Sequence, residues 1–313
     1  MDRVLCVVGP TASGKTALAI ALAHELDGEI VSADSMQLYR GMDIGTAKPS
    51  LDEREGVPHH MLDVADPSED YSAARYAKEA GDCVRGILAR GKLPIIAGGT
   101  GLYINALLGR VSFDEEAPDN AVRARLRGQA DTIGTQALYE RLTALDPAYA
   151  RTVHPNNVRR VLRALEIIET EGITVTERLA RAKARPERFD AVTIGLSPEP
   201  RELIWSRIDR RVGEMLERGL VGEARRLYAA DLSQTARQAI GYKELFAYFD
   251  GERSLSEASD DIRLHTRQYA KRQLTWFRAD STVQWISYDV NVKFSLILQN
   301  ARDICQSYGI MRT

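Results

Sequence analysis

The octapeptide Gly9-Pro10-Thr11-Ala12-Ser13-Gly14-Lys15-Thr16 constrains the fold of this chain more than any other segment. It matches the pattern GxxxxGK[ST] and lies between an apolar run at 4–8 and an Ala- and Leu-rich stretch at 15–26, the expected strand and helix. Glycines let the backbone turn its N–H groups inward, and the helix adds its positive end. Lys15 adds a charge and Thr16 a hydroxyl for Mg²⁺. We therefore predict that this loop binds a pyrophosphate-bearing ligand.

Apolar runs and helical stretches alternate around this loop. Helical periodicity occupies 73–90, and we expect further strands at 29–33, 93–97, 191–196 and 283–286. This alternation predicts an α/β fold, a P-loop NTPase-like core with a parallel sheet covered by helices. The intervening segment has helical patterns and no clear strand. We therefore predict a catalytic core of 1–116 and 190–313 with an all-helical insertion at 117–189.

Composition limits the classes of function. The chain has 313 residues and a net charge of -2, so any nucleic-acid binding must come from local basic patches. Its three cysteines include no CxxC pair, which indicates neither a disulfide framework nor a zinc site and favours the reducing cytoplasm. No run approaches the ~18 apolar residues that span a bilayer, so we expect no membrane partner.

Two polar residues follow the ends of predicted strands. P-loop kinases and ATPases usually place an Asp after an apolar strand to help hold Mg²⁺, but the run at 93–97 continues into Gly98-Gly99-Thr100. The acid instead follows the strand at 29–33, as Asp34. Because strand ends line the ligand crevice of such sheets, Asp34 and Thr100 should face the phosphate loop. Asp34 could bind Mg²⁺ through water, accept a proton, or only stabilise a turn.

Two arginines stand four apart on a predicted helix, so Arg207 and Arg211 share one face. Guanidinium groups suit a pyrophosphate clamp, although the nearby acids also allow a solvated basic face. His59 and His60 lack a third spaced ligand and are expected to be structural rather than metal-binding.

Six further segments resemble the bacterial tRNA dimethylallyltransferase family, also called isopentenyl-tRNA transferases. They are SADSMQLYRGMDIGTAKPS (32–50), PHHMLDV (58–64), AGGTGLYINALL (97–108), HPNNVRRVLRALE (154–166), QAIGYKEL (238–245) and TRQYAKRQLTWFR (266–278). The resemblance runs from about Val4 to Trp285 in the expected order. The C-terminal end carries no usable motif.

The resemblance implies transfer of a dimethylallyl group from dimethylallyl diphosphate to the N6 amine of an adenine, with release of pyrophosphate. That adenosine would lie 3′-adjacent to the anticodon in tRNAs that read codons beginning with U. It would be flipped into a channel that the donor enters from the other side. The phosphate loop would hold the donor's pyrophosphate, with Mg²⁺, rather than ATP. We expect a cytoplasmic monomer whose partners are the tRNA anticodon stem-loop and dimethylallyl diphosphate.

The resemblance also implies roles for individual residues. Asp34 would take the N6 proton, Thr100 would orient the base or the amine, and Arg211, with Arg207 beside it, would join the loop at 9–16 in binding diphosphate. The expected tRNA contacts are Asp34, Ser35, Met36, Gln37 and Thr100; Arg123, Arg159, Arg160, Val161, Leu162 and Arg163 in the insertion; Arg237, Gln238, Gly241 and Tyr242; and Lys271, Arg272, Gln273, Trp276 and Arg278. Arg267 belongs to the last basic cluster, whereas Tyr269, Trp276 and Phe277 are expected to pack mainly in the core.

Three other functions stay open. A relative that prenylates free adenine nucleotides would use the same loop and Asp34, but the insertion and the KRQLTWFR block would be superfluous for it. A P-loop small-molecule kinase would turn over ATP, and the missing acid after 93–97 counts against it. A non-catalytic RNA-binding module that uses a nucleotide as a switch would leave Asp34 without a proton to accept.

Overall fold

The computed structural model describes residues 2–111 and 120–311. Contacts divide the chain into two compact units, a larger one of Met1–Leu108 with Arg188–Thr313 and a smaller one of Gly109–Glu187. The insertion was expected at 117–189, so the smaller unit begins earlier than that range. The expected N-terminal boundary, at 116 and 117, lies outside the described residues.

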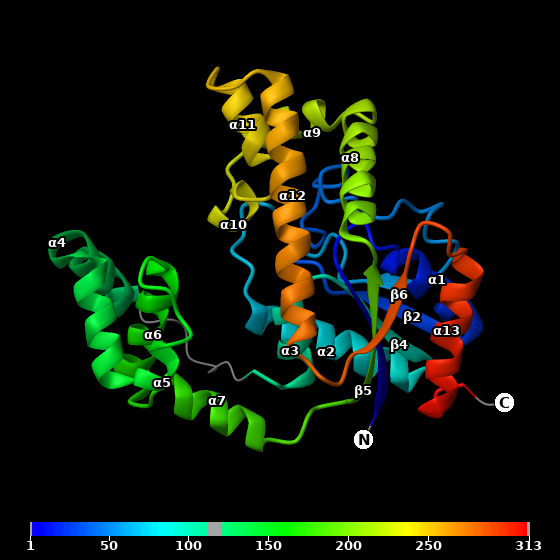
Figure 1. Ribbon diagram of the computed structural model, residues 1–313, viewed down its shortest axis with the longest axis horizontal. Helices are drawn as coiled ribbons and strands as arrows, with labels where there is room; N and C mark the ends of the chain where they lie inside the picture. The colour runs from blue at the N-terminus through cyan, green and yellow to red at the C-terminus, as the bar shows by residue number, and fades with distance from the viewer. Residues whose placement is uncertain (1, 112–119, 312–313) are drawn as a thin grey trace. The chain divides into compact units, whose positions relative to one another are not determined.

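The larger unit is built on one parallel sheet, which in the described residues has the strand order β3-β2-β4-β1-β5-β6 (Figure 1). Every neighbouring pair is parallel. The strands are β1 (Arg3–Val8), β2 (Gly28–Ser32), β3 (His59–His60), β4 (Leu93–Gly98), β5 (Asp190–Pro198) and β6 (Gln284–Tyr288). The predicted strands are confirmed, and β3 is added at the sheet's edge. Since β1 lies between β4 and β5, the phosphate loop leaves the middle of the sheet, with the ends of β2 and β4 to one side.

Helices cover both faces of this sheet. The described helices of the larger unit are α1 (Lys15–Glu25), α2 (Ala73–Ala89), α3 (Gly101–Leu108), α8 (Arg201–Glu217), α9 (Leu220–Tyr228), α10 (Gln234–Arg237), α11 (Lys243–Phe249), α12 (Leu255–Arg278) and α13 (Phe294–Ser307). Alternate residues of β1 enter different cores: Cys6 packs with α2 and α3, whereas Val7 packs with α1 and α13. A strand buried on both faces reads as a continuous apolar run, as 4–8 does.

Four helices of the larger unit gather beyond the strand ends. Figure 1 shows α8, α9, α11 and α12 on the side where β5 leads into α8. The C-terminal helix α13 lies elsewhere, against α1, where Arg302 pairs with Glu25. No helix in the described part of the chain is long and apolar enough to cross a membrane.

The smaller unit is helical in its described residues, with α4 (Asn120–Leu145), α5 (Pro147–Ala150), α6 (Val158–Glu171) and α7 (Val175–Ala184). It has a core of its own, formed by residues such as Leu142, Val161 and Leu165. Non-helical dihedrals at Gly134 break α4, so the two helices predicted at 120–129 and 135–145 meet there.

Candidate functional site

The loop between β1 and α1 has the geometry of an anion cradle. Ala12 and Gly14 take positive φ angles of 63° and 82°, which turns the backbone tightly. Gly14 begins α1 without a side-chain cap, so the positive end of the helix is directed at the loop. A Cβ on Gly9 would come within 3.0 Å of the Leu196 carbonyl oxygen. Ser13 Oγ is buried with no hydrogen-bond partner among the described residues, so it can donate to a ligand.

Two cations accompany this loop. Lys15 Nζ donates to the carbonyl oxygen of Pro10 at 3.3 Å. Burial lowers the pKa of the Lys15 ammonium to about 8, against a raising effect of Asp34 and a further lowering by Arg211. Burial also lowers the pKa of Arg211, which Asp34 raises. A bound anion would therefore stabilise both charges.

A cavity of about 480 Å³ opens beside these groups. Thr11, Lys15, Asp34 and Arg211 line one part of it. Its apolar lining includes Ile208, Val212, Met215 and Ile262 from α8 and α12. Its other polar residues include Gln238, Lys243, His265, Gln268 and Arg272. The cavity therefore combines an anion-binding part, an apolar wall and a polar wall rich in donors.

Asp34 and Thr100 lie on neighbouring strand ends, as expected. Asp34 Oδ1 accepts N–H groups from Met36 at 2.9 Å and Gln37 at 3.4 Å, so the carboxylate does stabilise a turn. It also lines the cavity, and it helps burial to raise the pKa of Tyr269 to about 12. Thr100 Oγ1 accepts the N–H of Ser35 at 3.0 Å, which fixes the turn from the end of β4.

Gln273 joins three parts of the site. Its Oε1 accepts the N–H of Thr11 in the phosphate loop at 2.8 Å, and its Nε2 donates to the carbonyl oxygen of Gly99 at 3.0 Å. A Cβ on Gly99 would come within 2.0 Å of that amide nitrogen, and a Cβ on Gly98 within 2.2 Å of the Ala33 carbonyl oxygen. The glycines after β4 thus allow β2, β4 and α12 to approach closely.

The structure changes the expectation for Arg207. Arg211 lines the cavity and lies 3.5 Å from Thr11 Oγ1, whereas Arg207 is not among the residues that line it. Arg207 donates to the hydroxyl of Tyr288 at 2.9 Å, and that hydroxyl donates to the carbonyl oxygen of Ser13. Arg207 therefore supports the phosphate loop through Tyr288 instead of reaching the cavity as half of a clamp.

Three expected tRNA contacts have buried side chains. Val161 and Tyr242 are 0% exposed, and Gln273 is 4% exposed. Val161 packs in the core of the smaller unit, and the Tyr242 hydroxyl donates to Glu223 at 2.7 Å. We correct the expectation of surface contacts for these three: Val161 packs inside the smaller unit, and Tyr242 and Gln273 are buried in the larger one.

Three more expected contacts have other partners. Gln37 Nε2 donates to the carbonyl oxygens of Thr46 and Ala47, both at 3.2 Å, so its amide holds the next loop. In the smaller unit, Arg123 and Arg163 both pair with the buried carboxylate of Glu166, at 2.9 and 2.7 Å.

Other expected contacts are exposed or line the cavity. Arg159 and Arg160 lie on α6, with Leu162 half-buried between them and the core. Met36, Gln238, Gly241 and Arg272 line the cavity. Exposed side chains in the larger unit also include Arg237, Lys271, Trp276 and Arg278. By contrast, Arg267 is paired with both oxygens of Asp209, which fixes α12 against α8.

Thr16 is the expected Mg²⁺ ligand. It lies exposed in the first turn of α1, beside the phosphate loop. In the described residues no group of three or more His, Cys, Asp or Glu could hold a metal. A single hydroxyl fits Mg²⁺, because this ion is usually completed by phosphate oxygens and water. His59 and His60 instead contact the Val57 carbonyl and Glu29, at 2.8 and 2.7 Å.

Several site residues escaped sequence reasoning. The apolar cavity wall was not predicted, because Ile208 and Val212 have the spacing of ordinary core positions. His265 and Lys243 line the cavity, but an isolated His or Lys gives no motif. Lys48 lies within the block at 32–50, but its burial between Asp43 and Asp63 cannot be read from the sequence.

Comparisons with known proteins agree on one family. The sequence profile described as IPP transferase matches residues 37–280. The chain is 46% identical over 285 residues to the tRNA dimethylallyltransferase of Halalkalibacterium halodurans, covering 91% of this chain and 90% of that protein. It is 48% identical over 296 residues to that of Geobacillus thermodenitrificans, covering 94% and 93%.

Solved structures give the same result. The crystal structure of the full-length tRNA isopentenylpyrophosphate transferase from Bacillus halodurans has a TM-score of 0.74 at 42% identity, covering 98% of this chain and 96% of that chain. A eukaryotic dimethylallyltransferase described as acting on tRNA has a TM-score of 0.79 at 30% identity, covering 98% and 79%.

Proposed function

This chain belongs to the IPP transferase family, and from that premise we propose that it transfers a dimethylallyl group from dimethylallyl diphosphate to tRNA. The acceptor is the N6 amine of the adenosine 3′-adjacent to the anticodon, in tRNAs that read codons beginning with U. The names of the relatives support a dimethylallyl group as the transferred group and tRNA as the acceptor. The comparisons give no support to a free-nucleotide transferase, a kinase or a non-catalytic RNA module.

One observation carries the proposal: a carboxylate and two cations line the same cavity beside a phosphate loop. Lys15 and Arg211 stand where a diphosphate would bind, and Asp34 stands on the same wall. An adenine amine is a weak nucleophile, and pyrophosphate leaves readily only when its charge is neutralised. The site therefore offers both a proton acceptor and a charge sink.

The proposed step is a displacement at carbon. The N6 lone pair attacks C1 of the dimethylallyl group, and the C1–O bond breaks, with its electron pair leaving on pyrophosphate. The loop amides, Lys15 and Arg211 stabilise that charge, and Asp34 accepts the N6 proton. Thr100 holds the turn that carries Asp34, so that the carboxylate is oriented before the reaction begins.

The Thr16 hydroxyl would help to hold Mg²⁺, which would supply further positive charge to the leaving group. The chain's own part is to orient the diphosphate. Gln273 fixes Thr11 from α12, and Arg207 acts on Ser13 through Tyr288. The loop is therefore braced on two sides.

We place the tRNA at the exposed basic residues of each unit. Arg159 and Arg160 in the smaller unit, and Lys271 and Arg272 in the larger, can neutralise backbone phosphates. The exposed ring of Trp276 could stack on an unpaired base. The proposal includes a monomeric enzyme acting in the cytoplasm, where unmodified tRNA is available.

The test is to incubate the protein with dimethylallyl diphosphate, Mg²⁺ and an unmodified tRNA transcript, and to analyse the nucleosides by mass spectrometry. We expect one adenosine to gain the dimethylallyl mass, with an equal amount of pyrophosphate released. Parallel reactions replace the tRNA with adenosine monophosphate, or the donor with ATP. Product in either replacement, and none with tRNA, would refute the proposal.

A further inference from the structure

The segment at 43–48 contributes to one wall of the cavity. Gly45 and Thr46 line it, as do Gln238 and Gly241 from the segment before α11. Gly45 and Gly241 are neighbours: a Cβ added to Gly241 would lie 3.8 Å from the Gly45 Cα, at van der Waals distance. These two segments belong to the larger unit and lie away from the phosphate loop in sequence. Their relative position is fixed by contacts with a buried carboxylate.

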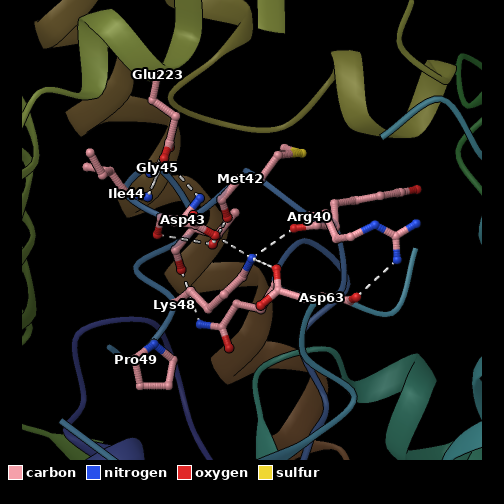
Figure 2. Close-up of polar contacts among 12 residues, drawn as sticks. Arg40, Met42, Asp43, Ile44, Gly45, Lys48, Pro49, Asp63 and Glu223 are labelled. Carbon is pink, nitrogen blue, oxygen red and sulfur yellow. Dashed lines mark hydrogen bonds and ion pairs between the residues drawn. The ribbon is translucent and has the colours of Figure 1, made fainter. Parts of the chain in front are cut away.

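Glu223, on α9, holds the first segment. Its carboxylate accepts the N–H groups of Asp43 at 3.1 Å, Ile44 at 2.9 Å and Gly45 at 3.0 Å. Figure 2 shows the carboxylate pointing into the turn made by these residues. Successive N–H groups that converge in this way form a nest for an anion, and here the anion is the protein's own side chain.

The same carboxylate holds the second segment. The Tyr242 hydroxyl donates to Glu223 Oε1 at 2.7 Å, next to Gly241. The hydroxyl end of the Tyr242 ring lies against Gly45, where a Cβ would come within 2.5 Å of it. Glu223 is 3% exposed, so its charge is stabilised by these donors instead of by water. Both walls are thus tied to one buried carboxylate.

A buried cation fixes the far end of the first segment. The side chain of Lys48 is 4% exposed, and its Nζ contacts Asp43 Oδ1 at 2.6 Å and Asp63 Oδ1 at 2.5 Å. It also donates to the carbonyl oxygen of Tyr39 at 2.8 Å. Figure 2 shows the ion pairs of Lys48 with Asp43 and Asp63. The Asp43 side chain therefore pairs with Lys48, and its backbone N–H donates to Glu223. These two contacts hold the turn from both sides.

We propose that Glu223 is a positioning residue for the tRNA nucleotide, fixing the two cavity walls 43–46 and 238–242 between which that nucleotide is held. Glu223 contacts these two walls, whereas Gln273 and Tyr288 form hydrogen bonds with the phosphate loop. Loss of the carboxylate should therefore affect the RNA substrate more than the diphosphate substrate. The inference rests on the proposed tRNA activity and deepens it.

The test compares Glu223→Gln with the wild-type enzyme in tRNA prenylation. A neutral amide turns an NH₂ group toward N–H donors, so the nest loses part of its acceptor. We expect the KM for tRNA to rise by about tenfold or more, since hydrogen bonds to a charged group are lost. The Kd for dimethylallyl diphosphate, measured by calorimetry without tRNA, should stay close to wild type. Glu217→Gln, an exposed glutamate at the end of α8, is the matched control.

Tyr242→Phe is the second variant, needed if Glu223→Gln does not fold. It removes one donor to Glu223 and keeps the ring against Gly45, so we expect a smaller rise in the same KM. An unchanged KM for tRNA in the folded variants would overturn the proposal. Equal losses of tRNA and donor binding would also overturn it, because they indicate a general structural role. Failure of the proposed function itself would be distinct, since the wild-type enzyme would then give no product.

Discussion

The carboxylate of Asp34 has a structural role and, in the proposed reaction, a chemical one. Sequence reasoning left a turn residue and a proton acceptor as alternatives, and the structure contains the turn: Oδ1 accepts from Met36 and Gln37. The same carboxylate lines the cavity with Lys15 and Arg211. The two roles are compatible because a carboxylate has two oxygens, each able to accept hydrogen bonds.

Replacing Asp34 with Asn should separate these roles. The amide oxygen can still accept from the turn, but the side chain no longer takes a proton. We expect single-turnover prenylation to fall by about 10²–10⁴-fold, while the affinities for donor and tRNA stay near wild type. Rapid-quench assays and calorimetry measure the two effects. Turnover at the wild-type rate would show that Asp34 is only a turn residue.

The pKa of Lys15 predicts a pH dependence of donor binding. Binding of diphosphate needs the ammonium, and its pKa of about 8 means that the charge is lost as the pH rises above that value. We expect the affinity for dimethylallyl diphosphate to fall above about pH 8, by up to tenfold per pH unit. The stability of the free protein should change in the opposite sense. Because burial lowers the pKa of Lys15, this group adds stability as the pH rises from about 8 toward the ordinary lysine pKa of 10.5.

Calorimetry across this pH range provides the measurement, and Lys15→Arg provides the control because its guanidinium stays charged. The variant should lose the inflection near pH 8. If the wild type binds the donor equally well at high pH, the ammonium is not required for binding.

At the scale of elements, the strands were easier to predict than the helices. Apolar runs in β1, β2, β4 and β5 are long, bounded and β-branched, and they appear as expected. Helix α3 was missed because nearly all of its side chains are buried, which leaves no polar face to reveal a period. Helix α13 does have a period, with Ile297, Ala301 and Cys305 four apart and buried, so its signal was present but unused.

Sequence spacing also has a limit at the site itself. Strand ends predicted that Asp34 and Thr100 lie together, and the family resemblance favoured Arg211. Asp34 and Arg211 line one cavity, and Thr100 binds the turn that follows Asp34. Sequence spacing could not predict Glu223 or Tyr288, since each works through a contact between residues distant in sequence.

The spacing of β2 and β4 gives a prediction at the element scale. A methyl group on Gly98 would lie 2.2 Å from the carbonyl oxygen of Ala33, a backbone atom that cannot rotate away. Gly98→Ala should therefore push the strands apart next to Asp34 and reduce the free energy of unfolding by roughly 1–3 kcal/mol. Chemical denaturation measures this change.

The matched control is Gly86→Ala within α2, where the new methyl would meet only the end of Arg90 at 3.5 Å. It should leave stability equal or raise it by up to about 1 kcal/mol, because Ala is the better helix former. Equal stabilities for the two variants would contradict the argument from close strand spacing.

At the scale of the molecule, the exposed basic residues of each unit predict an RNA footprint on that unit. Replacing Arg159 and Arg160 with Gln, or Lys271 and Arg272 with Gln, should weaken tRNA binding and lower the slope of log affinity against log salt. The expected reduction is about 0.7–0.9 for each phosphate contact removed. Filter binding over a salt series measures it. The control is Arg302→Gln on α13, which breaks the pair with Glu25 and should leave the salt slope unchanged.

An unchanged slope for either pair would remove that unit's basic residues from the footprint. A reduced slope for both would mean that each unit contacts phosphates of the same tRNA.

The position of β1 between β4 and β5 has a consequence for biosynthesis. One edge of this central strand can pair only after the ribosome has made the smaller unit and then β5. At about 5–20 residues per second, that edge waits roughly 10–40 s. The smaller unit has its own core and can fold during this interval. The nascent chain therefore carries an open strand edge, the kind that chaperones bind, until β5 emerges.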